Sequence, residues 1–140
     1  MTSITKTLSE AIDRFDVDVL DHLDRSVSIP MISHIGRQGD VLILAKPRGR
    51  KATTPIPAGG YPAVRGENNG NTHLLLADGA AWFDAEEPSP TKLTLGVLTV
   101  EKGSTGYLAH PEHGYLAIAP GTYELRRQRE QADVLRMVAD

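Results

Sequence analysis

Two histidines and a glutamate in one short segment, His110-Pro111-Glu112-His113-Gly114, are the residues here best suited to chemistry. Proline followed by glycine is typical of a tight turn, so the turn presents both imidazoles and the carboxylate together. If the strand expected to begin at His73 is a neighbour, three imidazoles converge near Glu112. His73, His110 and His113 are then candidate ligands for a divalent metal such as Zn, Fe, Ni or Mn, with Glu112 as ligand or general base. The alternative, which so short a motif favours, is a polar hairpin tip.

Positive charge is concentrated in two places, although the net charge of the chain is -3. A Pro- and Gly-rich stretch, residues 46–66, carries five basic and no acidic residues, and a second group lies near the C-terminus. The candidate binding residues are Arg48, Arg50, Lys51, Arg127 and Arg129. Such a stretch can follow a phosphate backbone by charge alone, which keeps RNA among the alternatives. RNA modules that read sequence depend on stacking, however, and Tyr61 is the single aromatic residue of this stretch, so a solvated loop is favoured.

Several function classes are excluded by what the sequence lacks. It contains neither the Gly-x-Ser-x-Gly motif of serine hydrolases nor the phosphate-binding loop of NTPases. It contains no cysteine, which excludes disulfides, thiolate metal sites and cysteine nucleophiles. The first thirty residues have neither the basic start nor the apolar run of a signal peptide or membrane span. We therefore expect a cytoplasmic protein that does not interact with membranes.

The elements that position these residues begin with a predicted helix between Thr7 and Arg25. Its apolar residues recur every three or four positions, and Thr7 with Glu10 fits a capping box. β-Branched and turn-forming residues around Asp16 predict a break there. The acidic side chains are Asp13, Asp16, Asp21 and Asp24. They form either the solvated side of a packed helix or a surface that docks on a basic loop or strand of another subunit.

From residue 26 onward, short apolar runs bounded by Gly, Pro, Asn or Asp predict successive strands. The predicted strands are 41–45, 73–76, 80–83, 93–100, 105–110, 115–119 and 122–129. The stretch 46–66 is predicted to be a long surface loop, and the tail 131–138 a short helix or an extended edge. Strands at this spacing predict a mainly β protein, an antiparallel β-sandwich, jelly roll or small barrel, behind the N-terminal amphipathic helix.

Two resemblances come from the C-terminal region. The segment Ala119-Pro120-Gly121-Thr122-Tyr123 resembles the hairpin that precedes an inner strand in cupins and other jelly rolls. The remaining cupin pattern is absent, because residues 71–73 are Asn-Thr-His and Glu112 lies beside the histidines, so cupin activity is not implied. The longer pattern HPEHG, PGTY, RRQRE and the final VAD is similar to a group of uncharacterised small bacterial proteins, and that resemblance implies no activity.

Together these patterns predict an N-terminal helical segment, residues 1–25, followed by a β-rich domain, residues 26–140. We expect a non-catalytic binding or assembly module without a cofactor, which self-associates through its N-terminal segment or a sheet edge, or binds another protein. A cupin-like metal-dependent enzyme that uses the histidine cluster and a divalent metal is the first alternative. An RNA-associated protein is the second.

Overall fold

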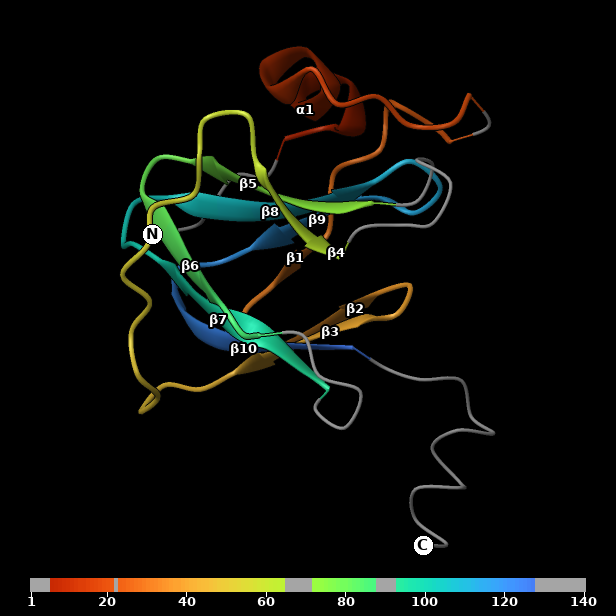
Figure 1. Cartoon of the computed structure of the whole chain (residues 1–140). Helices are drawn as coiled ribbons and strands as arrows, with labels where there is room; N and C mark the ends of the chain where they lie inside the picture. The colour runs from red at the N-terminus through yellow and green to blue at the C-terminus, as the bar shows by residue number, and fades with distance from the viewer. Residues whose placement is uncertain (1–5, 22, 65–71, 88–92, 128–140) are drawn as a thin grey trace, which may run out of the picture.

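The computed structural model describes residues 6–21, 23–64, 72–87 and 93–127, and shows two five-stranded sheets packed face to face (Figure 1). The β8 sheet contains, in order, β1 (Met31–Ile32), β9 (Gly114–Ile118), β8 (Thr105–His110), β5 (His73–Asp78) and β4 (Tyr61–Val64). The β10 sheet contains, in order, β2 (Ile35–Gln38), β3 (Val41–Ala45), β10 (Gly121–Arg127), β7 (Thr94–Val100) and β6 (Ala81–Ala85). The predicted mainly β sandwich is confirmed, and it is not a closed barrel.

The sandwich is antiparallel, as predicted, apart from one short pair: β1 and β9 run parallel, and the other pairs of described strands are antiparallel. After β1 the chain passes through residues 33–34 into β2 of the other sheet. Strands β1, β2 and β4 were not predicted. Strand β4 lies inside the stretch 46–66, which is therefore not one continuous loop.

Helix α1 spans Leu8–Phe15, about half of the predicted length, and the predicted capping box is present. The Thr7 hydroxyl accepts a hydrogen bond from the Glu10 amide, and the Glu10 carboxylate accepts one from the Thr7 amide. Asp16 adopts a left-handed conformation with φ of 56° and ends the helix where the break was predicted. Because the chain after Asp16 is not helical, Asp21 and Asp24 do not share a helix face with Asp13, and the predicted acidic helix face was wrong beyond Asp16.

Two apolar layers hold the domain together. The larger lies between the sheets and includes Ile43, Leu98 and Leu108. The second lies on the outer face of the β8 sheet, where Leu8 and Ala11 of the helix pack with strand residues. The helix is thus one outer layer of the domain (Figure 1). Among the described residues, no helix is long and apolar enough to cross a membrane.

Candidate functional site: the histidine cluster and the basic hollow

Strand pairing brings the three predicted histidines together at one end of the sandwich. Strand β5 pairs with β8 so that Leu74 is opposite Ala109, which places His73 across from His110. The ring centroids of His73 and His110 are 4.3 Å apart, and those of His110 and His113 are 4.6 Å apart. The strand that begins at His73 is therefore a neighbour of the 110–114 turn. His73 and His110 are buried, whereas His113 is exposed.

A buried glutamine of the other sheet determines which nitrogen of His73 carries the proton. Gln38 Nε2 donates to the backbone carbonyls of Leu108 at 2.8 Å and of Gly114 at 3.1 Å. The amide orientation is therefore fixed, and Gln38 Oε1 accepts from His73 Nδ1 at 2.9 Å. Burial, followed by the neighbouring imidazoles of His110 and His113, lowers the pKa of His73 to about 4. His73 is consequently neutral at physiological pH.

The turn uses His110 as a backbone hydrogen-bond acceptor. His110 Nδ1 accepts from the Glu112 amide at 3.1 Å and the His113 amide at 3.3 Å, so this nitrogen is unprotonated. In neutral His110 the proton is then on Nε2, the nitrogen that would have to bind a metal. Within the part of the chain that the structure describes, no group of three or more His, Cys, Asp or Glu side chains is arranged to hold a metal ion. The side chain of Glu112, within this turn, is exposed.

A second site is formed where β3 leads into a basic turn on the β10 sheet. An open hollow of about 600 Å³ lies there. Its lining residues are Ala45, Lys46, Pro47, Arg48, Gly49, Arg50, Val97, Thr122, Tyr123 and Glu124. Val97 and Glu124 are cross-strand partners, and they alternate along their strands with core residues such as Leu98 and Leu125. This basic hollow is therefore on the outer face of the β10 sheet, away from the β8 sheet.

The basic turn is held in place by the sheet. The Lys46 amide donates to the Thr122 carbonyl, and the Gly49 amide donates to the Lys46 carbonyl, each at 2.8 Å. Downstream, Arg50 Nη1 lies 2.6 Å from Asp84 Oδ2. The Asp84 carboxylate also accepts from the amides of residues 53 and 54, and these contacts, the one with Arg50 foremost, hold its pKa well below the usual range.

The charges around the basic hollow are not all neutralised. Arg50 is paired with Asp84, and Glu124 lies 3.3 Å from Arg126. Lys46 and Arg48 are exposed and form no ion pair with any residue that the structure describes. The hollow thus presents two free cations at its rim. A ligand that carries negative charge is the one this rim would attract.

The other predicted binding residues are not part of this hollow. Lys51 lines a separate hollow beside Trp82 and Lys102. Arg127 is exposed at the end of β10, and Arg129 lies outside the described residues, as does the tail 131–138. Tyr61 packs on Phe83, with ring centroids 5.6 Å apart, so its ring does not form a free stacking platform. The basic stretch is therefore divided between two sites.

Two residues essential to these arrangements were missed in the sequence. Gln38 precedes the Gly39-Asp40 turn, but nothing local indicates that its amide crosses to the other sheet. Asp84 directly follows the predicted strand 80–83 and lies close to Glu86 and Glu87 in sequence, while its partner Arg50 is 34 residues away. Tertiary pairing alone defines both roles.

The fold defines a small β-sandwich domain with a helical outer layer. The chain belongs to a family described as a domain of unknown function, DUF8820, whose profile matches residues 37–128. The match runs from within β2 to the end of β10, so it includes the basic hollow and the Gln38 to His73 contact but not helix α1. No curated protein and no solved structure matches the chain.

Proposed function

We propose that the protein is a non-catalytic binding module and that its binding site is the basic hollow. The observation that supports this function is the pair of free cations, Lys46 and Arg48, at the rim of a hollow of about 600 Å³. A volume of this size suits a small ligand or a protruding segment of a partner. The hydrogen bonds of the turn support a hollow that is already formed before its ligand binds.

The composition of the lining indicates the chemistry of the ligand. Val97, Ala45 and Pro47 contribute apolar surface, while the cations are at the rim. A ligand with a negatively charged group and an apolar part satisfies both. Glu124 also lines the hollow, but Arg126 beside it balances its charge. The favoured ligand therefore directs its negative group toward Lys46 and Arg48.

The histidine cluster does not favour the metal-dependent alternative. His73 Nδ1 is hydrogen-bonded to Gln38 of the facing sheet, and His110 Nδ1 accepts hydrogen bonds from two backbone amides of the turn. These contacts stabilise the fold, and the histidine nitrogens among the described residues are not arranged to bind one metal ion together. The ring of Tyr61, which packs on Phe83, likewise does not form a free stacking platform for RNA.

The proposal can be tested by titrating a 15N-labelled sample with pyrophosphate, a simple anionic probe, and measuring the backbone amide chemical shifts. We expect shift changes centred on residues 45–50 and 122–124. Arg48→Glu should weaken pyrophosphate binding about tenfold, because the variant replaces attraction by repulsion. Lys102→Glu makes the same charge change at an exposed turn outside the hollow and should have little effect. Equal weakening by both variants, or no shift changes in the hollow, would overturn the proposal.

A further inference from the structure

We infer that the basic hollow receives an acidic loop of a second copy of this chain, so that the protein assembles head to tail. This inference rests on the proposed function, since it assigns an occupant to the same hollow. The acidic loop is the segment 16–25, without residue 22, which the structure does not describe. Its acidic residues are Asp16, Asp18, Asp21 and Asp24, and all four are exposed.

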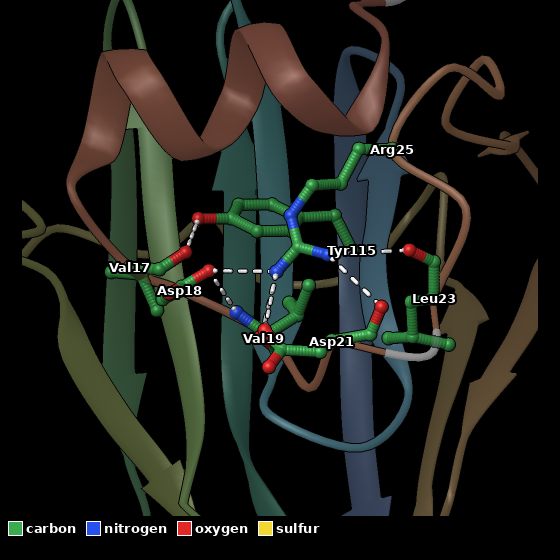
Figure 2. Close-up of polar contacts among 7 residues, drawn as sticks. All are labelled: Val17, Asp18, Val19, Asp21, Leu23, Arg25 and Tyr115. Carbon is green, nitrogen blue, oxygen red and sulfur yellow. Dashed lines mark hydrogen bonds and ion pairs between the residues drawn. The ribbon is translucent and has the colours of Figure 1, made fainter.

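The acidic loop is organised around one arginine, as Figure 2 shows. The Arg25 guanidinium donates to the backbone carbonyls of Val19 at 3.0 Å and Leu23 at 3.3 Å, and to Asp18 Oδ1 at 3.2 Å. Asp21 Oδ1 lies 3.8 Å from the same guanidinium. Arg25 thus closes the loop from inside while the carboxylates remain at the surface. A loop that is already ordered loses less conformational entropy when it binds.

Two further contacts fix the acidic loop on the β8 sheet. The buried Tyr115 hydroxyl donates to the Val17 carbonyl at 2.7 Å (Figure 2), and the Leu20 amide donates to the Pro111 carbonyl at 2.8 Å. The side chain of Val19, within the loop, is buried in the outer apolar layer. The exposed carboxylates are therefore carried on a segment attached to the domain at several points.

The tip of the acidic loop has the chemistry that the basic hollow requires. Leu20 is 42% exposed, although leucine is usually buried, and it lies between Asp18 and Asp21 in sequence. The side chain of Asp21 is fully exposed, and that of Asp18 is 76% exposed. An exposed leucine flanked by carboxylates matches an apolar lining with Lys46 and Arg48 at its rim. The charges would also direct the approach of the two copies.

The positions of the two surfaces determine the kind of assembly. The acidic loop packs on the outer face of the β8 sheet through Val17, Val19 and Leu23, on the side where α1 lies (Figure 1). The basic hollow lies on the outer face of the β10 sheet. Because they are on opposite faces, two copies cannot satisfy both contacts in one reciprocal pair. After pairing, one copy instead keeps a free hollow and the other keeps a free loop. Such a heterologous contact produces open chains, or rings if the rotation closes.

Sedimentation velocity over a range of concentrations at low salt tests this assembly. We expect species larger than dimers that dissociate on addition of salt, because the interface is charged. Asp21→Lys and Arg48→Glu should each weaken the association constant about tenfold, and the double variant should recover most of the loss. Asp13→Lys, on the exposed surface of α1, makes the same charge change outside the loop and should leave association unchanged. Pyrophosphate should compete with assembly.

The outcomes separate this inference from the proposed function. If the protein stays monomeric at all concentrations while pyrophosphate still binds the hollow, the inference fails and the proposed function stands. If neither association nor pyrophosphate binding occurs, both fail. A stable dimer that grows no further, or a double variant no better than the single variants, would also overturn head-to-tail assembly.

Discussion

Gln38 and His73 are joined by a buried hydrogen bond of 2.9 Å that links the β10 sheet to the β8 sheet. The same glutamine amide donates to backbone carbonyls of β8 and β9, so one side chain from β2 contacts three strands of the facing sheet. Gln38 is 5% exposed, and its polar atoms are therefore paired inside the protein rather than with solvent. This end of the sandwich depends on one polar side chain.

Replacing Gln38 by leucine should lower the free energy of unfolding by about 2–4 kcal/mol, because two carbonyls and the His73 Nδ1 proton lose their partner. The leucine fills a similar volume, so the loss reports mainly on the hydrogen bonds. Denaturant unfolding measures the change. Arg37→Leu in the same strand alters an exposed side chain and should change stability by less than about 1 kcal/mol. Similar losses in both variants would contradict the assigned role of Gln38.

Stability should fall as the pH is lowered from about 6.5 toward 4, because of His73. The pKa of His73 falls from 6.5 to about 4 in the folded protein, so between these values the unfolded chain binds a proton that the folded protein does not. The contribution is fully present above pH 6.5 and reaches about 3 kcal/mol at most. Denaturant unfolding across this pH range measures it.

The assignment to His73 can be checked independently by an NMR titration of its imidazole. The ring protons should titrate near pH 4 rather than near 6.5. A titration near 6.5, together with a flat stability profile between pH 7 and 5, would be incompatible with a buried neutral His73.

Local sequence signals predicted the strands that carry continuous apolar runs. Residues 41–45 and 105–110 were predicted with the bounds observed, since turn-forming residues flank both runs. Strands β1, β2 and β4 were missed because they are short, and because Gly36 and Pro62 interrupt the apolar pattern. Their strand conformation comes from neighbours that are distant in sequence.

The sequence indicated which basic residues and histidines could form the candidate sites, but not the partners that determine their charge and protonation. The basic residues and the histidines were visible as clusters, and the contact of His73 with the turn was correctly made conditional on strand pairing. Asp84 pairs with Arg50 and so determines which cations stay unpaired. Gln38 accepts from His73 Nδ1 and so determines which nitrogen of that histidine is protonated. These partners are 34 and 35 residues away from Arg50 and His73, so no local pattern could reveal them.

Replacing Asp16 by glycine should raise the free energy of unfolding by about 0.5–1 kcal/mol. Asp16 has φ of 56°, a conformation that glycine adopts without the cost of a Cβ atom. The backbone hydrogen bond from its amide to the Ile12 carbonyl is retained. Asp16→Ala should instead lower the free energy of unfolding. Alanine keeps the Cβ atom but lacks the short polar side chain that lets aspartate adopt the left-handed conformation more readily. Denaturant unfolding should therefore rank glycine above aspartate and aspartate above alanine.

Replacing Gly39 by alanine should destabilise the protein by two additive effects at the end of the sandwich. Gly39 has φ of 55°, which alanine adopts at a cost of about 1–2 kcal/mol. A Cβ at this position would also lie 2.9 Å from His113 Nε2 and 3.2 Å from His73 Cε1, so the imidazoles would have to move. Gly103 is the matched control, since its φ is also positive, at 86°, but no atom lies within 4 Å of an added Cβ.

The difference between the two alanine variants isolates the contact with the histidine cluster. Gly103→Ala should show only the backbone cost, whereas Gly39→Ala should lose more stability and also shift the NMR signals of the His73 and His113 rings. Denaturant unfolding of both variants at pH 7, where His73 is neutral, gives the comparison. Equal losses with unchanged imidazole signals would show that the β2–β3 turn does not press on the cluster. In that case, the polar link between the two sheets at this end would be the Gln38 hydrogen bonds, without a contribution from contact between the turn and the imidazoles.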